Sequence, residues 1–209
     1  MFEAVIFDFG GVITESPFEA FNRMEARLGI SPNTVRRINA TNPDTNAWAL
    51  FERAEIGADE FDRMFSEEAA ALGVTLAGRD VLSCLHGSVR PRMLEALKRI
   101  AGKFRTGCIT NNVKTAGPDH ANRDALVAEA FSQFGHVLES SKIGIRKPDP
   151  RIYTMMLEAL SVKPERAVYL DDLGINLKPA KALGMTTIKV VTGDDAIAEL
   201  ERHLGMKLG

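Results

Sequence analysis

The sequence predicts an α/β fold in which a parallel sheet is wrapped by helices and interrupted by an inserted helical bundle. Short apolar runs bounded by turn residues recur along the chain, and most are followed by a stretch with helical periodicity. This alternation favours a parallel sheet. The strands are expected at Ala4–Phe9, Thr106–Thr110, His136–Leu138, Ala167–Leu170 and Thr186–Val191.

The alternation breaks between about residues 15 and 87, where helical segments follow one another without a strand. In each segment the apolar residues recur every three to four positions, as Phe18, Phe21 and Met24 do, which is typical of amphipathic helices. We therefore expect a small bundle over the end of the first strand, and divide the chain into a core (1–15 and 88–209) and an insertion (16–87). The expected helices are Pro17–Leu28, Pro32–Ala40, Asp44–Ala54 and Ala58–Leu72.

The charge balance excludes several classes of partner. Lysine and arginine total 26 against 28 aspartate and glutamate, a formal net charge of -2. No basic field indicates nucleic acid or an anionic membrane surface. A local cationic group must then bind any anionic substrate.

The cysteines and the hydropathy pattern suggest a location in a reducing cytoplasm. Cys84 and Cys108 form no C-x-x-C pair and have no histidine at zinc spacing, so neither a disulfide framework nor a zinc site is indicated. The amino terminus has no signal-peptide pattern, and no apolar run reaches the roughly 18 residues of a membrane span. We expect an unprocessed protein in a reducing cytoplasm, and its oligomeric state cannot be read from the sequence.

Polar groups follow the apolar runs in a suggestive order. Asp8 comes after the first run, Thr110-Asn111 end the second, Lys147 lies in a loop, and Asp171-Asp172 follow the fourth. Singly, each has an ordinary explanation: a turn, a strand end, a solvated lysine or a helix cap. Because ligands of open α/β sheets gather where parallel strands end, the ordered combination favours a functional site.

Together these residues suit phosphoryl transfer. A carboxylate such as Asp8 can attack phosphorus and form an aspartyl-phosphate. Mg²⁺ prefers oxygen ligands and keeps several waters, so Asp8, Asp172, a main-chain carbonyl and a phosphate oxygen suit it. Asp171 is expected to act through water or as an outer-shell acceptor, while the Lys147 ammonium neutralises phosphate oxygens.

The chain resembles the haloacid dehalogenase superfamily, and especially its branch near the amino-terminal phosphatase domain of soluble epoxide hydrolases. Four signatures carry the resemblance: Phe7-Asp8-Phe9-Gly10-Gly11-Val12; Ile109-Thr110-Asn111-Asn112; Lys147-Pro148-Asp149; and Tyr169-Leu170-Asp171-Asp172 with Asn176-Leu177-Lys178-Pro179-Ala180. They span essentially the whole length.

The resemblance implies a Rossmann-like core, a helical cap of the type inserted after the first strand (C1-type), and Mg²⁺-dependent hydrolysis of a small phosphorylated metabolite. It also implies residue roles. Asp8 is the nucleophile and a metal ligand, Thr110 and Asn111 donate to phosphate, Lys147 stabilises charge, and Asp172 binds the metal.

Gly10 departs from the family pattern, in which a second aspartate moves protons to and from the leaving oxygen and water. Gly10 offers only its carbonyl to the metal. Three alternatives remain open. The leaving group is acidic enough to depart unaided, as from a sugar 1-phosphate or an acyl phosphate; another group, such as Glu15 or a cap residue, replaces the acid; or the site is a catalytically weak sensor of phosphate ligands.

A metal-independent haloacid dehalogenase is a further alternative on the same fold, since that reaction also lacks an acid two residues after its nucleophile. The paired Asp171-Asp172 favours a metal and hence phosphate. Three smaller expectations accompany this interpretation: Trp48 packs with Phe51 inside the cap, Arg146 is solvated, and the irregular polar stretch Lys114–Arg123 could line the crevice.

Overall fold

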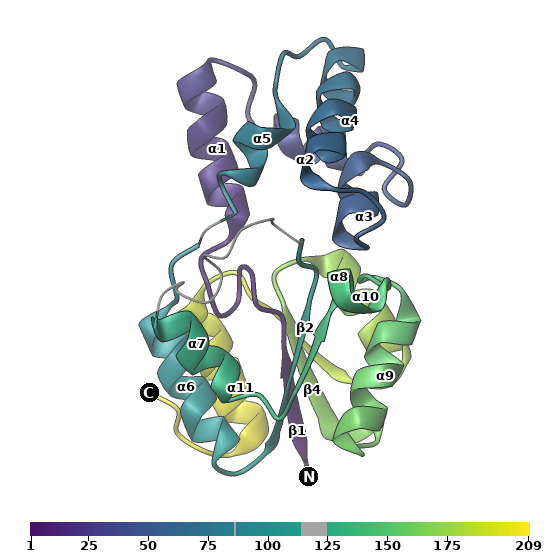
Figure 1. Ribbon diagram of the computed structural model, residues 1–209. Helices are drawn as coiled ribbons and strands as arrows, with labels where there is room; N and C mark the ends of the chain where they lie inside the picture. Colours follow the sequence, from purple (N-terminus) through teal and green to yellow (C-terminus); the bar gives the residue numbers. More distant parts are fainter. Residues whose placement is uncertain (86, 114–124) are drawn as a thin grey trace.

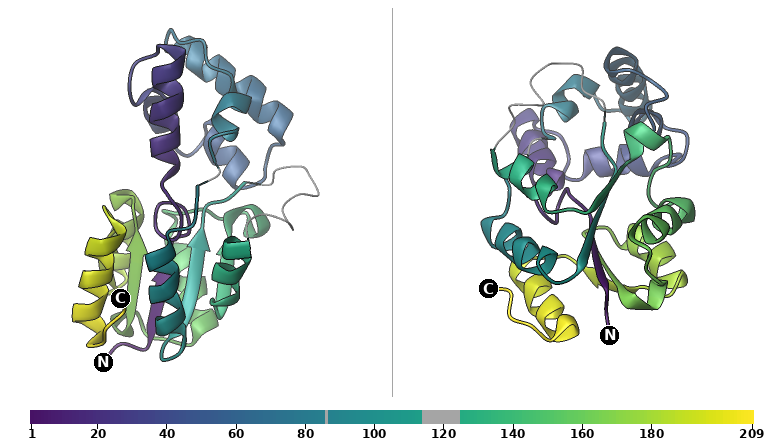
Figure 2. Two further views of the ribbon diagram at one scale, coloured as in Figure 1. Left: turned by 90° about the vertical axis from the view of Figure 1, so that its left-hand side faces the viewer. Right: turned by 60° about the horizontal axis from the view of Figure 1, so that its bottom comes forward.

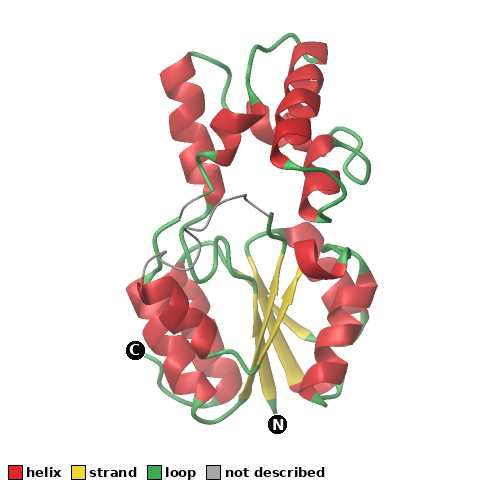
Figure 3. Cartoon of the chain, in the orientation of Figure 1, coloured by secondary structure: helices red, strands yellow, loops and turns green. Residues whose placement is uncertain are grey.

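The predicted α/β class with a parallel sheet is confirmed. The computed structural model describes residues 1–85, 87–113 and 125–209, and the expected lining at Lys114–Arg123 lies outside them. Within them, five strands form one sheet in the order β3-β2-β1-β4-β5, and every neighbouring pair is parallel (Figure 3). The strands are β1 (Ala4–Phe7), β2 (Arg105–Thr110), β3 (His136–Glu139), β4 (Ala167–Asp171) and β5 (Thr186–Lys189).

Helices cover both faces of the sheet, as Figure 1 shows. On one face lie α6 (Pro91–Ala101), α7 (Ala125–Ser132) and α11 (Gly193–Leu204); on the other lie α9 (Pro150–Leu160) and α10 (Gly174–Ala182). The short α8 (Ser140–Ile143) follows β3, and the 3-10 helix η2 (Pro164–Arg166) precedes β4.

The central strand β1 is buried on both sides, which explains its unbroken apolar sequence. Successive side chains of a strand point to opposite faces. Val5 and Phe7 accordingly join the core cluster under α6 and α11, while Ala4 and Ile6 join the cluster under α9. This packing fixes the place at which Asp8 leaves the sheet.

Five helices lie between β1 and α6 in the chain: α1 (Pro17–Leu28), α2 (Thr34–Ala40), α3 (Ala47–Glu52), α4 (Ala58–Ala71) and α5 (Gly78–Leu82). They share their own apolar cluster, built around Phe21, Phe51, Phe61 and Phe65. Figures 1 and 2 show these helices beyond the carboxyl ends of the strands. We call them the cap; the domain boundaries at residues 15 and 88 stay a prediction, and α5 was not expected.

Several element boundaries differ from the prediction. The second cap helix begins at Thr34 rather than Pro32, because Asn33 has a left-handed backbone (φ 62°). The third begins only at Ala47, where Asn46 caps it by accepting a hydrogen bond from Ala49 N (2.8 Å), and it ends before Ala54, which is also left-handed (φ 57°). Such local backbone reversals end a helix whatever its apolar periodicity.

The predicted first and last strands are also too long. β1 ends at Phe7 instead of Phe9, because the chain turns at once: Phe9 O accepts a hydrogen bond from Ile13 N (2.9 Å). β5 ends at Lys189 rather than Val191. Asp8 is thus the first residue after its strand.

The two chain segments that connect the cap to the core run side by side. Thr14 and Val89 form an isolated antiparallel bridge, and Arg90 Nε donates to Thr14 O (3.1 Å). The chain therefore enters and leaves the cap through two adjacent segments. Among the described residues, no helix combines the length and the apolar character needed to cross a bilayer.

Candidate active site

The structure brings Asp8, Lys147, Asp171 and Asp172 together at the carboxyl ends of β1 and β4. Lys147 Nζ lies 2.8 Å from Asp8 Oδ1 and 2.8 Å from Asp171 Oδ2. Carboxylate oxygens of Asp8, Asp171 and Asp172 all lie within 4.8 Å of one another. Three acidic groups and one ammonium therefore share a single site.

Lys147 is a buried cation and not a solvated lysine. Its side chain is only 1% exposed. Burial alone lowers the pKa of this ammonium, but the carboxylates of Asp171 and Asp8 outweigh burial and hold the pKa above its ordinary value. Lys147 thus stays charged throughout the physiological pH range.

Asp171 is held by four protein donors. Its carboxylate accepts hydrogen bonds from Lys147 Nζ (2.8 Å), Tyr169 OH, Asn176 Nδ2 (3.1 Å to each oxygen) and Leu173 N (2.8 Å). The residue is fully buried. With both oxygens engaged, Asp171 fits an outer-shell acceptor better than a direct metal ligand.

Asp8 is held through one oxygen. Oδ1 accepts from Phe9 N (2.6 Å) and faces Lys147, whereas Oδ2 receives no hydrogen bond from the part of the chain that the structure describes. Burial raises the pKa of the Asp8 carboxyl well above its usual range, and Lys147 opposes that rise. A divalent cation beside Oδ2 would favour the ionised, nucleophilic form.

Asp172 lies against the glycine turn. Its Oδ2 accepts a hydrogen bond from Ser16 Oγ (3.0 Å). A Cβ at Gly11, where φ is +77°, would lie 2.3 Å from the same oxygen, so only glycine permits this approach. Burial and the neighbouring Asp171 raise the pKa of Asp172. By contrast, no atom of the described residues lies within 4 Å of a Cβ built on Gly10.

Thr110 is the last residue of β2, the strand beside β1, and Asn111 comes directly after it. Thr110 is buried. The Asn111 amide is engaged with the backbone of Lys147: Oδ1 accepts from Lys147 N (2.8 Å), and Nδ2 donates to Lys147 O (3.0 Å). Their predicted binding of phosphate stays a prediction.

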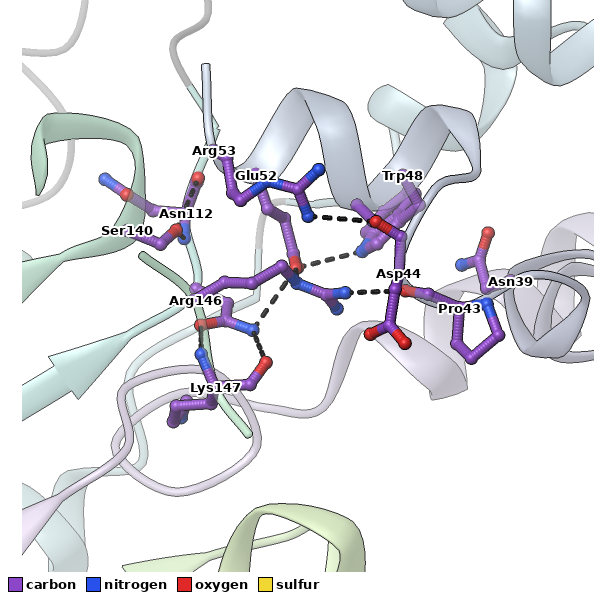
Figure 4. Close-up of polar contacts among 12 residues, drawn as sticks. Asn39, Pro43, Asp44, Trp48, Glu52, Arg53, Asn112, Ser140, Arg146 and Lys147 are labelled. Carbon is purple, nitrogen blue, oxygen red and sulfur yellow. Dashed lines mark hydrogen bonds and ion pairs between the residues drawn. The ribbon is translucent and has the colours of Figure 1, made fainter. Parts of the chain in front are cut away.

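The expectation that Arg146 is solvated is wrong. Its Nε donates to Glu52 Oε2 (2.7 Å) and its Nη1 to Pro43 O (2.9 Å), so that it joins the core to the cap (Figure 4). Trp48 lies in the cap cluster as expected, with its ring edge-on to Phe61, and its Nε1 donates to Glu52 Oε1 (2.8 Å).

Glu52 and Ser16 were not predicted as parts of this site, and Tyr169 and Asn176 were named in the fourth signature without a role. Two of them had a readable signal. Tyr169 lies two residues before Asp171 in a strand, so both point to the same face. Glu52 lies four residues after Trp48, on the same side of a helix.

The donor set suits Mg²⁺. Asp8 Oδ2, which receives no hydrogen bond from the described residues, and the Asp172 carboxylate are hard oxygen donors of the kind that Mg²⁺ prefers, and Gly10 lies in the turn after Asp8. No histidine or cysteine belongs to this cluster, among the residues that the structure describes. The set therefore differs from zinc sites, which use nitrogen and sulfur ligands.

The site combines a carboxylate after the first strand of a parallel α/β sheet, a buried lysine and paired acids after a neighbouring strand. This combination defines a class of hydrolases. The chain belongs to the haloacid dehalogenase-like hydrolase family, whose profile matches residues 2–184. The resemblance inferred from the four signatures is thus confirmed.

Curated relatives support the same family. The chain is 34% identical to mouse acyl-CoA dehydrogenase family member 10 over 99% of its length but only 20% of that protein, and 30% identical to mouse bifunctional epoxide hydrolase 2 over 95% of its length and 38% of that protein. It thus spans between a fifth and two fifths of these relatives. It is also 25% identical to the sesquiterpene phosphatase astK of Aspergillus oryzae, covering 98% of this chain and 97% of that one.

Solved structures share the fold at low sequence identity. A haloacid dehalogenase family enzyme from Bacteroides thetaiotaomicron, in complex with magnesium and inorganic phosphate, matches with a TM-score of 0.62 and 17% identity, covering 90% of this chain and 94% of that one. The L-2-haloacid dehalogenase from Xanthobacter autotrophicus with covalently bound chloropropionic acid matches with a TM-score of 0.56 and 18% identity, covering 100% and 85%. These likenesses establish the fold alone.

Proposed function

We propose that this protein is a Mg²⁺-dependent phosphatase that hydrolyses a small phosphorylated metabolite through an aspartyl-phosphate on Asp8. The observation that carries the proposal is the position of the buried Lys147 ammonium, 2.8 Å from both Asp8 and Asp171, beside the carboxylate of Asp172. A buried cation next to a carboxylate with one free oxygen suits the binding of a phosphoryl group.

In the proposed reaction, an Asp8 oxygen forms a bond to phosphorus while the bond between phosphorus and the leaving oxygen breaks. Water then attacks the phosphorus while the bond between phosphorus and the Asp8 oxygen breaks, and the proton that the water loses passes to solvent; this releases inorganic phosphate and restores the Asp8 carboxylate. Lys147 neutralises charge on the phosphoryl oxygens, and the Thr110 hydroxyl donates to them. Both protons of the Asn111 side-chain amide are engaged by Lys147 O and Glu52 Oε2, so Asn111 would donate through its backbone N–H. Held by Asp8, Asp172 and the Gly10 carbonyl, Mg²⁺ would supply a positive charge for those same oxygens.

The empty space at Gly10 favours a substrate whose leaving group departs without help. Loss of a positioned acid typically lowers a rate by about 10²- to 10⁴-fold. A sugar 1-phosphate or an acyl phosphate avoids much of that loss, because its leaving group is stable as an anion. Glu15, the other candidate acid, is exposed, so the structure offers it no support.

The relatives agree with phosphate chemistry. Besides the sesquiterpene phosphatase, a phosphorylated carbohydrates phosphatase from Thermotoga maritima is 27% identical over 89% of this chain and 83% of that protein. The structural neighbour with bound magnesium and inorganic phosphate supports the same assignment.

The test is a panel of sugar phosphates and acyl phosphates, assayed for phosphate release with Mg²⁺ and with EDTA. Asp8→Asn, which keeps the shape of the side chain and removes the nucleophile, sets the background. We expect turnover by the wild type only, and its loss in EDTA. Phosphate binding with turnover at the Asp8→Asn background would instead indicate a sensor.

A haloacid dehalogenase is the second candidate, favoured by the matching fold of the Xanthobacter enzyme. That reaction needs no metal, so turnover of 2-chloropropionate that persists in EDTA would replace the phosphatase proposal. Lys147 supplies one positive charge against three clustered carboxylates, so a further cation would reduce the remaining repulsion, which favours the phosphatase.

A further inference from the structure

We propose that Glu52, which the cap contributes from α3, is a positioning residue for Lys147. It accepts hydrogen bonds from the side chain of Asn111, which holds the Lys147 backbone, and from the side chain of Arg146, the residue directly before Lys147. This inference rests on the proposed phosphatase function, in which the Lys147 ammonium must lie beside the reacting phosphoryl group.

Glu52 is a buried carboxylate with all of its contacts directed at donors. Its side chain is 8% exposed. Oε1 accepts from Trp48 Nε1 (2.8 Å), and Oε2 accepts from both Arg146 Nε (2.7 Å) and Asn111 Nδ2 (3.2 Å). Figure 4 shows the Glu52 side chain extending from the cap toward Arg146. A carboxylate at such a place organises the donors around it.

Glu52 is connected to Lys147 in two ways. Through its side chain, Asn111 bonds the Lys147 backbone at N and at O (2.8 and 3.0 Å), and Arg146 is the residue directly before Lys147 in the chain. By binding both side chains, Glu52 restrains the chain at Lys147. The Lys147 ammonium must in turn fit between two carboxylates, each 2.8 Å away.

This bracing makes the cap part of the catalytic arrangement. Glu52 is 94 residues from Arg146 and 59 from Asn111 in the chain, and it belongs to a helix outside the core. Arg146 also donates to Pro43 O, in the cap segment before the same helix. Lys147 is thus correctly placed when the cap is packed against the core. In the same way, closure of a domain completes the active site in other enzymes.

The contacts require an ionised carboxylate and not a neutral amide. A glutamine has one carbonyl oxygen and one NH₂ group. In one orientation its NH₂ meets the indole N–H of Trp48; in the other it meets the donors of Arg146 and Asn111. In either orientation of Glu52→Gln, the glutamine NH₂ group therefore faces another N–H donor. The substitution also leaves Arg146 without its charge partner.

The test compares Glu52→Gln with Glu55→Gln. The control removes a carboxylate three residues further on, where Glu55 pairs with Arg53 (2.5 Å) and is 50% exposed. With 4-nitrophenyl phosphate and Mg²⁺, we expect kcat of Glu52→Gln to fall about tenfold to a hundredfold, as displacement of a catalytic group by about 1 Å does. KM should change much less, and Glu55→Gln should behave as the wild type.

A second measurement does not depend on turnover. Hydrogen exchange of the Lys147 amide reports its bond to Asn111 Oδ1. We expect this amide to exchange about tenfold faster in Glu52→Gln, as in a local opening, while the amides of β1 and β4 keep their wild-type rates. Arg146→Lys, which keeps the charge but loses the Nε donor, should show both effects more weakly, and it replaces Glu52→Gln if that variant is unfolded.

Three outcomes overturn the inference: unchanged exchange at Lys147, faster exchange without loss of kcat in an active enzyme, or acceleration throughout β1 and β4, which indicates a general loss of stability. If the wild type hydrolyses no phosphate ester, the phosphatase proposal fails. The exchange measurement then still decides whether Glu52 holds Lys147 in place.

Discussion

Lys147 Nζ lies 2.8 Å from Asp171 Oδ2 in a region from which water is excluded, with the two side chains 1% and 0% exposed. This ion pair joins the loop before α9 to the carboxyl end of β4. Because Asp171 is itself fixed by Tyr169, Asn176 and the backbone of Leu173, it provides a rigid point against which the ammonium is held.

Removing the charge of Asp171 should therefore destabilise the protein strongly. Asp171→Asn leaves Lys147 buried with only Asp8 as a charge partner, and breaking a buried pair typically lowers the free energy of unfolding by about 3–5 kcal/mol. Tyr169→Phe removes one hydrogen bond to the same carboxylate, which contributes about 1.5–3 kcal/mol. Urea denaturation measures both. Equal effects of the two variants would mean that the ion pair adds nothing beyond one hydrogen bond.

Gly10→Asp should restore acid catalysis. Within the part of the chain that the structure describes, a Cβ at this position meets nothing within 4 Å, and Gly10 does not have the left-handed backbone of Gly11, so a side chain can be added there. Turnover of an alkyl phosphate with a poor leaving group should rise by about 10²- to 10⁴-fold, because the new carboxyl can protonate the departing oxygen. Release of the acyl group from an acyl phosphate in the first turnover should change little, because that step needs no proton donor.

Gly10→Asn is the matched control, since it has the size of aspartate without a transferable proton. An equal gain with both substrates, or an equal gain from Gly10→Asn, would contradict the idea that Gly10 limits the range of leaving groups.

Gly11→Ala should disturb Asp172 directly. The added Cβ would lie 2.3 Å from Asp172 Oδ2 in a backbone with φ of +77°. We expect a loss of about 1–3 kcal/mol of stability from the strained backbone, and we expect the variant to lack the increase in Tm that Mg²⁺ should produce in the wild type. Gly10→Ala, one residue earlier, should keep its stability within about 0.5 kcal/mol. Thermal melting with and without Mg²⁺ distinguishes the two.

The acidic cluster should make the metal-free protein less stable as the pH rises. Burial raises the pKa of Asp8 and Asp172 above the ordinary value of 3.8. Between that value and the raised ones, the folded protein binds more protons than the unfolded chain, so stability falls with increasing pH. Asp172→Asn removes one such group. The difference between the Tm of Asp172→Asn and the Tm of the wild type should therefore become more positive as the pH rises from about 4 to about 8.

Mg²⁺ should offset this loss. By binding the ionised carboxylates of the folded state only, it should raise the wild-type Tm more at about pH 8 than at about pH 4, where protons compete for the same oxygens. A difference in Tm between Asp172→Asn and the wild type that is constant with pH would mean that Asp172 titrates alike in the folded and unfolded states.

The sequence predicted the strands and the acidic residues at their ends because both depend on local patterns. Each strand is a short apolar run, and a parallel sheet brings all carboxyl ends to one edge, so Asp8, Asp171 and Asp172 had to lie near one another. Helix boundaries were less predictable. Asn33 and Ala54 adopt left-handed backbones that the apolar periodicity does not reveal.

The amino-acid sequence by itself determined the family, the parallel sheet and the set of polar residues at its carboxyl edge. Only the tertiary structure decided that Lys147 is buried between two carboxylates, that Asp171 is engaged with protein donors, and that Glu52 of the cap braces the Lys147 segment. The reason is physical. A residue's burial and its partners depend on segments tens of residues away, and these meet only when the cap packs onto the core.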